Sequence, residues 1–568
     1  MAGLLPNKKL FNSLFSEMEL MVAMNKPKQW NFKYDVIVMG TGGAALVSAI
    51  LAHDHGAKVL IIEKTAQLGG TTAFSGGVLW VPLNRYMGEA GISDSREEAL
   101  MYVRRLTGGK EPDPELIETF IDNGYKMIDY LHDHTPLRFS IPKGYPEYYS
   151  NLPGGKLEGR SLDPVPFNMD NLGDLASKIR NNPTFPPLTL EEGGALNGID
   201  FEKIVERMEN NTVTMGRSLI ASLLQALVDR EVEIWTESAG KELIADDDGA
   251  IIGLKIMREG KPCYVGAHKG VILASGGFEW NKQLVKTFLK GQVTHPLSPP
   301  GNEGDALIMA MKAGAALGNM SEAWWYPAMQ DPTFEYEDHI LNQLGGGGRT
   351  GPYSIIVNKH GKRFVNEGST YNDLPKTFYT YDPVTLDWPN EPPVWLIFDQ
   401  KMKDHTMILT MMPGEQAPEW VNQADNLRDL AQQIGIDAEG LEATVTRFNQ
   451  YAVQGQDPDF QRGTLFFEDL KGGGGNPRAN LGPIDQPPYY ALPIYFGTLG
   501  TSGGPRININ AQVIDHQGKP IEGLYSAGNA AMGIMGQTYA SAGGTLGPAL
   551  TFGYLAGISV SSRQSKEI

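Results

Sequence analysis

The sequence predicts an α/β fold: a sheet of largely parallel strands that carries a nucleotide-binding loop, with an α+β segment inserted into it. Two observations support this prediction. First, short apolar runs end directly in glycine turns at Val36–Met39 and again near 270–277 and 523–529, as buried parallel strands do. Second, the composition changes at 326–495, which is richer in aromatic residues and proline. A chain of 568 residues exceeds one ordinary core, so more than one domain is expected.

The first apolar run, Val36–Met39, leads into a glycine motif of the form G-x-G-x-x-A. In such a motif the first glycine permits a tight turn, the second lets backbone approach a pyrophosphate, and the alanine keeps the next helix close. The predicted helix Ala44–His55 points its free N–H groups at the phosphates. A second strand, Lys58–Ile62, ends at Glu63, where a carboxylate accepts hydrogen bonds from a ribose. The motif residues assigned to the cofactor are Gly40, Gly42, Gly43, Ala44 and Ala45.

A second glycine cluster follows the ribose acid and is not part of the bare NAD motif. It resembles the family of FAD enzymes that includes fumarate reductase flavoproteins and 3-ketosteroid dehydrogenases. That resemblance implies that the cluster lies along a bound FAD. The cofactor-binding residues assigned here are Lys64, Gly69, Gly70, Thr71, Thr72, Ser75, Gly76 and Gly77.

Composition narrows the choice of function. Hydrophobic residues make up 41% of the chain and charged residues 20%, which is typical of a globular protein. The net charge of −18 argues against a nucleic-acid partner. The single cysteine, Cys263, rules out an intramolecular disulfide and a zinc–thiolate site, and no metal site is predicted. No apolar run is long enough to span a bilayer, and the N-terminal segment with Lys8 and Lys9 is interpreted as an amphipathic extension.

Between the two glycine-bearing ends, the chain alternates helices, loops and strands. Residues 85–135 are expected to be helical and 139–164 a loop, whereas 166–212 is a polar insertion to which the sequence assigns no chemistry. A helix at 216–230 precedes a strand at 232–236 and a meander at 241–258. The domain limits predicted are 30–325 and 496–568 for the FAD-binding domain and 326–495 for the inserted catalytic domain. Further cofactor contacts are assigned to Ala274, Ser275, Gly276, Gly277, Asp305, Gly528, Asn529, Gly544, Thr545 and Leu546.

Three motifs combine tyrosine with glycine-rich backbone, and each resembles a motif of 3-ketosteroid dehydrogenases. They are Tyr145-Pro-Glu-Tyr148, the stretch from Gly361 to Tyr371, and Tyr539-Ala-Ser-Ala-Gly543 ahead of a glycine-rich helix start. The resemblance covers most of residues 33–565. It implies a Rossmann-like FAD-binding domain, an α+β catalytic domain and an enzyme that desaturates a cyclic ketone.

The resemblance also implies a role for each motif. Tyr539 and the Gly543 N–H would donate to the ketone oxygen, which acidifies the neighbouring proton. Tyr371 would remove that proton, and Tyr148 would lower the pKa of Tyr371 through a hydrogen bond. The neighbouring Tyr149 is an alternative partner for Tyr371. Tyr145 is assigned to substrate binding.

Several alternatives stay open at this stage. Tyr539 is followed by Ala540-Ser541, where Δ1-dehydrogenases often carry Pro-Gly. This resembles the Δ4-(5α)-dehydrogenases and assigns Ser541 to the ketone. Small cyclic ketones of the cyclohexanone type are another substrate class. A fumarate reductase is disfavoured because Ala530–Gly547 contains no arginine, histidine or lysine to clamp a dicarboxylate, and a flavin sensor would not need the three tyrosine motifs.

The predicted function is therefore FAD-dependent dehydrogenation, most simply of a 3-ketosteroid at its 1,2 bond. FAD is expected to bind non-covalently. The partners expected are a steroid or other cyclic ketone and an electron acceptor that the sequence does not identify. We expect a cytoplasmic protein and leave open a peripheral association with the inner face of the membrane.

Overall fold

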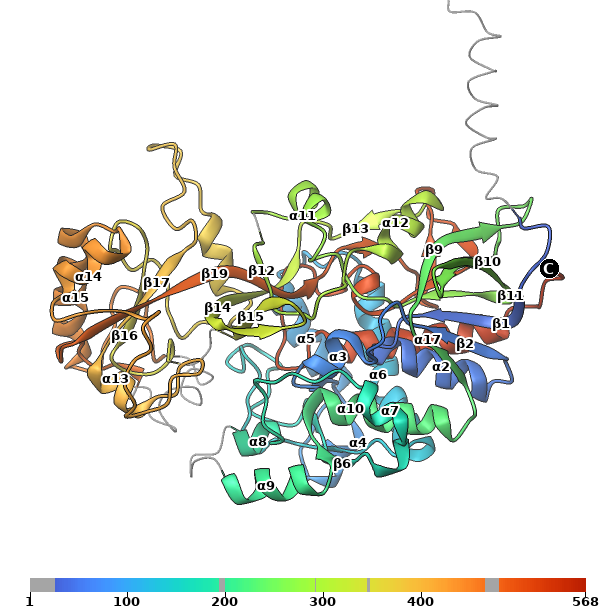
Figure 1. Cartoon of the computed structure of the whole chain (residues 1–568), viewed down its shortest axis with the longest axis horizontal. Coiled ribbons are helices and arrows are strands. Elements are labelled where there is room, and N and C mark those ends of the chain that lie inside the picture. The colour runs from blue at the N-terminus through green and yellow to red at the C-terminus, as the bar shows by residue number, and fades with distance from the viewer. Residues whose placement is uncertain (1–25, 194–199, 292, 345–347, 465–479) are drawn as a thin grey trace, which may run out of the picture.

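The computed structural model describes residues 26–193, 200–291, 293–344, 348–464 and 480–568. The predicted amphipathic extension at 1–25 lies outside these ranges. The described chain is elongated, with one sheet towards each end of its long axis (Figure 1).

The first sheet has eight strands, ordered β21-β22-β11-β1-β2-β8, with β9 and β10 joined to β11 as an antiparallel meander. The central pairs β22–β11, β11–β1, β1–β2 and β2–β8 are parallel, which confirms the predicted parallel sheet with a small meander. Its strands are β1 (Phe32–Met39), β2 (Val59–Ile62), β8 (Glu233–Trp235), β9 (Ser238–Ala245), β10 (Ile251–Arg258), β11 (Lys261–Leu273), β21 (Gln512–Ile514) and β22 (Pro520–Ser526).

Two helices from opposite ends of the sequence pack closely beside this sheet: α2 (Gly43–Asp54) and α17 (Leu546–Ser562). A Cβ added at Gly553 of α17 would lie 2.5 Å from the Ala44 carbonyl oxygen of α2. The predicted helix Ala44–His55 is α2 to within one residue at each end. Glycine in α17 therefore lets the last helix sit against the helix that follows the phosphate motif.

The second sheet has seven strands and is antiparallel apart from the β12–β19 pair. Strand β19 pairs with both β17 and β14 and runs from the outer lobe with β16 and β17 to the middle of the molecule (Figure 1). The strands are β12 (His295–Pro296), β14 (Ala323–Tyr336), β15 (His339–Leu344), β16 (Ser354–Val357), β17 (Val394–Asp399), β18 (Asn422–Ala424) and β19 (Tyr489–Thr501). The residue limits of the predicted domains stay a prediction, and the sheet itself draws strands from both sides of the proposed 326 and 495 boundaries.

The region 70–228 forms a helical layer with small strand pairs. The helical character expected for residues 85–135 is confirmed by three helices, two of which are capped by the side-chain oxygens of Ser95 and Asp113. The stretch 139–164, predicted as a loop, contains two short strands that pair with each other. The elements are α3 (Gly70–Phe74), β3 (Leu79–Trp80), α4 (Arg85–Glu89), α5 (Arg96–Thr107), α6 (Pro114–His134), β4 (Phe139–Ser140), β5 (Ser161–Pro164), β6 (Phe167–Asn168), η1 (Asp170–Leu172), α7 (Asp174–Lys178), α8 (Leu190–Gly193), α9 (Phe201–Glu209), β7 (Thr212–Val213) and α10 (Met215–Val228).

The remaining described elements connect the two sheets or cover the second one. They are α11 (Lys282–Phe288), α12 (Asp305–Lys312), β13 (Leu317–Gly318), η2 (Leu374–Tyr379), α13 (Gln400–His405), α14 (Leu427–Ile434), α15 (Ala438–Ala452), β20 (Gly504–Pro505) and η4 (Gly528–Ala530). In the described ranges, none of the helices is long and apolar enough to cross a membrane.

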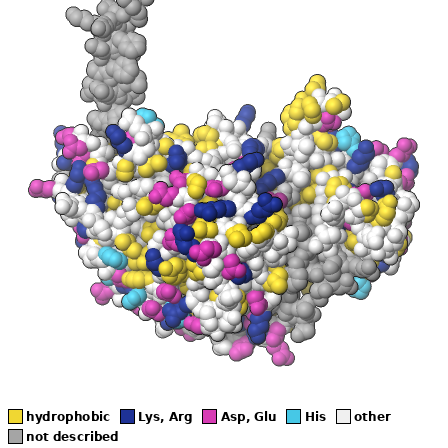
Figure 2. Space-filling model, turned by 180° about the vertical axis from the view of Figure 1, so that it is seen from behind, with side chains coloured by type: hydrophobic (Ala, Val, Ile, Leu, Met, Phe, Trp, Pro, Cys, Tyr) yellow, Lys and Arg dark blue, Asp and Glu magenta, His cyan; other side chains and the backbone are white. Residues whose placement is uncertain are grey.

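The surface mixes both charge signs. The face in Figure 2 carries lysine and arginine beside aspartate and glutamate, and an apolar tip projects from it. Exposed apolar side chains on the loop between η2 and β17 include Val384 at 88% and Leu386 at 71% exposure.

Candidate active site

One large cavity of about 490 Å³ runs between the two sheets and collects residues from both. The phosphate-motif end begins where β1 stops. Gly40 has φ +107°, and a Cβ there would lie 2.5 Å from the Ala274 carbonyl oxygen, so only glycine fits this turn. Gly42 is the N-cap of α2, whose N-terminal N–H groups therefore open onto the cavity.

The predicted ribose acid lies at the same end. Glu63 follows β2 and lines the cavity, and its carboxylate accepts hydrogen bonds from Thr41 Oγ1 at 2.7 Å and from the Thr65 N–H at 3.1 Å. The next residue, Lys64, bridges Glu303 and Asp305 at 3.1 and 2.7 Å. The acid is thus held in place by neutral donors, and the lysine ties this strand end to the start of α12.

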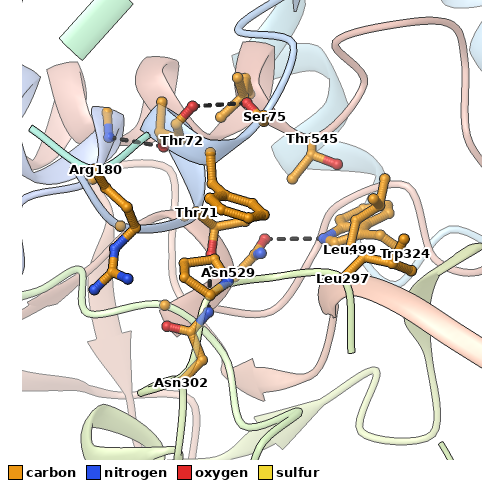
Figure 3. Close-up of a pocket in the computed structure, with 18 of the residues that line it drawn as sticks. Thr71, Thr72, Ser75, Arg180, Leu297, Asn302, Trp324, Leu499, Asn529 and Thr545 are labelled. Carbon is orange, nitrogen blue, oxygen red and sulfur yellow. Dashed lines mark hydrogen bonds between the residues drawn. The ribbon is translucent and has the colours of Figure 1, made fainter. Parts of the chain in front are cut away.

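The second glycine cluster forms the neighbouring wall. The Gly43 N–H donates to Thr72 Oγ1 at 3.1 Å, which joins the two glycine motifs directly. Gly77 has φ +69°, and a Cβ there would lie 2.4 Å from the Gly216 nitrogen, so α10 packs against bare backbone. Figure 3 shows Thr71 beside Asn302, whose amide donates to the Thr71 hydroxyl at 2.9 Å.

Most of the predicted cofactor residues line this cavity. Four do not: Ala45, Gly69, Gly277 and Gly544 are outside its lining. Ala45 is fully buried, as its predicted packing role requires. The residues that do line the cavity are Gly40, Gly42, Gly43, Ala44, Glu63, Lys64, Gly70, Thr71, Thr72, Ser75, Gly76, Gly77, Ala274, Ser275, Gly276, Asp305, Gly528, Asn529, Thr545 and Leu546.

The tyrosines predicted from three separate motifs meet in the same cavity. The Tyr371 ring centroid lies 5.5 Å from that of Tyr148 and 5.4 Å from that of Tyr539. Tyr326 of β14 stacks on Tyr371 at 4.6 Å, and Trp324 meets Tyr539 edge-on at 5.5 Å. Tyr145, Tyr148, Tyr371 and Tyr539 all line the cavity.

Burial dominates the electrostatics of this tyrosine cluster. It raises the pKa of Tyr371 well above its ordinary value, while the hydrogen bond with Tyr148 lowers the same pKa. Burial also raises the pKa of Tyr539, whose hydroxyl accepts a hydrogen bond from Thr545 Oγ1 at 3.1 Å. The Tyr148–Tyr371 hydrogen bond therefore acts in the predicted direction, against a larger opposing effect of burial.

Tyr149, the alternative partner of Tyr371, has a different environment. Its hydroxyl donates to the Asp373 carboxylate and lies 3.4 Å from Thr370 Oγ1, and it is outside the cavity lining. The structure therefore brings Tyr148 rather than Tyr149 to the cavity.

Gly543 lines the cavity at the turn before α17. It has φ +90°, and a Cβ there would lie 2.4 Å from the Trp80 nitrogen. Its carbonyl accepts from the Trp80 N–H at 3.0 Å. Among the described residues, nothing accepts a hydrogen bond from the Gly543 N–H, so this donor is left for a ligand.

Ser541 departs from its predicted position. It is fully buried, its hydroxyl lies 3.2 Å from Ser161 Oγ, which donates to it, and it is outside the cavity lining. Its carbonyl accepts from the Gly544 N–H. The turn that places Tyr539 and Gly543 at the cavity turns Ser541 towards β5, which does not support a direct contact with the ketone.

Several residues that line the cavity were not identified from the sequence. The insertion 166–212, to which no chemistry was assigned, contributes Arg180, Asn182, Thr184, Phe185 and Leu190. Arg180 is buried and pairs with Glu337 at the β14–β15 turn. The strand β14 adds Trp324 and Tyr326. The run of three consecutive aromatic residues at 324–326 is a signal that could have marked this edge.

The residues fit FAD on their own geometry. Glycines whose Cβ would clash with backbone line the phosphate-motif end, a helix N-terminus faces it, and an acid stands at the ribose position. The described lining contains no histidine or cysteine, the side chains that most often attach flavin covalently, which agrees with non-covalent binding.

Comparison with known proteins places these features in a family. Residues 35–546 match the model described as FAD binding domain. The chain is 37% identical to 4-oxocyclohexanecarboxylate 2-dehydrogenase of Sinomonas cyclohexanicum, over 93% of each protein. It is 35% identical to 3-oxosteroid 1-dehydrogenase of Mycobacterium tuberculosis, over 94% of this chain and 99% of that protein.

A solved structure agrees with the sequence matches. It is that of 3-ketosteroid delta1-dehydrogenase from Sterolibacterium denitrificans in complex with 1,4-androstadiene-3,17-dione, with a TM-score of 0.87 at 32% identity, covering 93% of this chain and 99% of that one. By the family-model match over residues 35–546 and these full-length identities, the chain belongs to the FAD-dependent oxidoreductases of the 3-ketosteroid dehydrogenase family.

Proposed function

We propose that this enzyme desaturates the 1,2 bond of a 3-ketosteroid. The observation that carries the proposal is the convergence of Tyr371, Tyr148, Tyr539 and the unused Gly543 N–H on the cavity whose other wall fits FAD. Desaturation beside a ketone needs a base for the acidic proton, donors for the ketone oxygen and a hydride acceptor. The cavity offers residues for the first two, and FAD, when bound, supplies the third.

Two donors are assigned to the ketone oxygen. The Tyr539 hydroxyl accepts from Thr545, so its own hydrogen is free to point at a ligand. The Gly543 N–H is fixed by a turn that only glycine can adopt. Together they would stabilise the negative charge that develops on the oxygen as the neighbouring proton leaves.

Tyr371 is assigned to remove the acidic proton beside the ketone. It lies between Tyr148 and Tyr539, and the donated hydrogen bond from Tyr148 favours its ionised form. Because burial holds the Tyr371 pKa well above its ordinary value, its basic form is a small fraction at neutral pH and keeps growing as the pH rises into the alkaline range. Tyr145 and the apolar Leu190, Leu297 and Leu499 line the remainder of this end and would hold the ring system.

A small cyclic ketone is the second candidate substrate. The relative that acts, by its name, on 4-oxocyclohexanecarboxylate is 37% identical to this chain, as close as the steroid enzymes are. The same ketone activation would serve either ring. The electron acceptor, the cytoplasmic location and a peripheral association with the membrane stay proposals.

Product analysis separates these candidates. Purified FAD-loaded protein is incubated with androst-4-ene-3,17-dione or with 4-oxocyclohexanecarboxylate and an artificial electron acceptor, and products are identified by mass spectrometry and NMR. We expect the steroid to lose two hydrogen atoms and gain a 1,2 double bond. Conversion of the cyclohexanone alone would overturn the steroid assignment, and conversion of neither would overturn the proposed reaction.

A further inference from the structure

A buried carboxylate stands behind the cofactor wall and is used by none of the steps above. Glu279 follows the glycines that end β11 and is 3% exposed. Its carboxylate accepts hydrogen bonds from Ser298 Oγ at 2.7 Å, from Asn302 Nδ2 at 2.7 Å and from the Thr501 N–H at 3.3 Å. In the described part of the chain no lysine, arginine or histidine pairs with it. Burial raises the pKa of the Glu279 carboxyl, and the hydrogen bonds from Ser298, Asn302 and Thr501 oppose that rise by favouring the ionised form. A carboxylate held by neutral donors alone is an expensive arrangement for a purely structural role.

Asn302 links this carboxylate to the cavity through hydrogen bonds. One Nδ2 hydrogen goes to Glu279 and the other to Thr71 Oγ1 at 2.9 Å, as Figure 3 shows for the Thr71 contact. Its Oδ1 lies beside Gly276, where an added Cβ would come within 2.6 Å of that oxygen. Asn302, Thr71 and Gly276 all line the cavity.

The hydrogen-bonding chemistry of Glu279, Asn302 and Thr71 determines which atom donates and which accepts in each contact. An ionised carboxylate only accepts, so it forces the amide nitrogen of Asn302, and not the oxygen, to face it. The Thr71 oxygen then accepts from the same nitrogen, which leaves the Thr71 hydrogen free to donate. The wall therefore presents a donor at Thr71 and an acceptor at Asn302 Oδ1.

We infer that Glu279 is a positioning residue for FAD. Through Asn302 it fixes the polarity of the wall, so that Thr71 donates to an acceptor atom of the cofactor and Asn302 Oδ1 accepts from one of its hydroxyl or N–H groups. The carboxylate also holds the end of β19 through Thr501, which ties the second sheet to the same wall. This inference concerns the cofactor alone and stands whichever ketone is the substrate.

Glu279→Gln is the direct test. A glutamine places an NH2 group where one carboxylate oxygen accepted, so it must oppose either the Ser298 and Asn302 donors or the Thr501 N–H. We expect the dissociation constant for FAD, measured by fluorescence titration of the apoprotein, to rise about 10- to 100-fold, with a shifted visible spectrum of the bound flavin. A dissociation constant within about twofold of wild type would overturn the inference.

Asp399→Asn is the matched control for lost stability. Asp399 is also fully buried and accepts from the backbone N–H groups of Asp485 and Gln486 at 3.1 Å each, although unlike Glu279 it has a cation nearby, with Lys401 Nζ 3.3 Å from its carboxylate. It lies in the second sheet away from the cavity lining. We expect it to lower the melting temperature without changing FAD affinity. An equal loss of FAD affinity in both variants would show that Glu279 acts only by stabilising the fold, and would overturn the inference.

A double-mutant cycle with Thr71 tests the chain of hydrogen bonds from Glu279 through Asn302 to Thr71, here called the relay. Thr71→Val removes the hydroxyl at nearly constant volume, and Thr71→Ser restores it. If the relay operates, Thr71→Val weakens FAD less in the Glu279→Gln background than in wild type, and Thr71→Ser returns most of the affinity. Independent effects would multiply, and a double variant weakened by the full product would contradict the relay.

Discussion

The two walls of the cavity are built by different means. The cofactor wall is made largely of backbone: Gly40 and Gly77 have conformations and neighbours that exclude any side chain. The ketone wall is made of side chains, with Tyr148, Tyr371 and Tyr539 brought together from three distant segments. Backbone contact demands the absence of a Cβ, whereas the chemistry of the second wall demands particular hydroxyl groups. Substitutions in the two walls should therefore fail in different ways, the first by losing flavin and the second by losing rate.

The largest effect is expected from Gly40→Ala. Its Cβ would meet the Ala274 carbonyl oxygen at 2.5 Å, which forces the strand end and the phosphate turn apart. We expect purified Gly40→Ala to contain little or no FAD by absorbance. Gly56→Ala is the control, because Gly56 has φ +85° but nothing within 4 Å, and it should keep its flavin. Full flavin content in Gly40→Ala would refute the backbone description of this wall.

Tyr539→Phe should have the next largest effect, and in rate alone. The ring and its contacts with Tyr371 and Trp324 are kept, while one donor to the ketone oxygen is lost. We expect kcat to fall about 100- to 1000-fold with flavin content unchanged. Loss of flavin together with rate would show that the two walls are not separable at this residue.

Glu63→Ala tests the cofactor wall, where a substitution should weaken FAD binding and leave the rate unchanged. The acid accepts hydrogen bonds only from Thr41 and Thr65 in the described chain, leaving acceptor capacity for a ribose. FAD binding should weaken by about 1.5–3 kcal/mol, while kcat at saturating FAD stays near wild type. Isothermal titration of the apoprotein measures the first and steady-state kinetics the second. A variant with wild-type affinity would place the ribose acid elsewhere.

The smallest effect is expected from Tyr149→Phe. Its hydroxyl is engaged by Asp373 outside the cavity, so kcat should change by less than about twofold. Tyr148→Phe, the matched variant one residue earlier, should be clearly slower, because Tyr371 then loses its donor. The reverse order of the two rates would make Tyr149 the true partner.

The contrast between the walls also decides what the sequence can reveal. The segment 34–77 was predictable almost residue by residue, because one continuous strand, turn and helix make the contact and glycine marks each close approach. The tyrosine cluster could be assembled only through family resemblance, since no local pattern says that residues 148, 371 and 539 meet. Arg180 and Phe185 were missed because the insertion reaches the cavity only in the folded chain. The orientation of Ser541, whose side chain lies outside the cavity lining, could not be predicted because nearness in sequence to Tyr539 does not reveal which way a tight turn directs the side chain.

The central claim is that Tyr371 removes the proton and that FAD binding is independent of it. Stopped-flow flavin bleaching tests this most directly, with wild type and Tyr371→Phe each mixed anaerobically with androst-4-ene-3,17-dione or with dithionite across a range of pH. Because burial holds the Tyr371 pKa well above its ordinary value, its basic form stays a growing minority from neutral to alkaline pH, so bleaching of the wild type by the ketone should accelerate across that range. Tyr371→Phe should bleach normally with dithionite but about 100- to 10,000-fold more slowly with the ketone, and without that rise. Bleaching of Tyr371→Phe by the steroid at the wild-type rate would contradict the account.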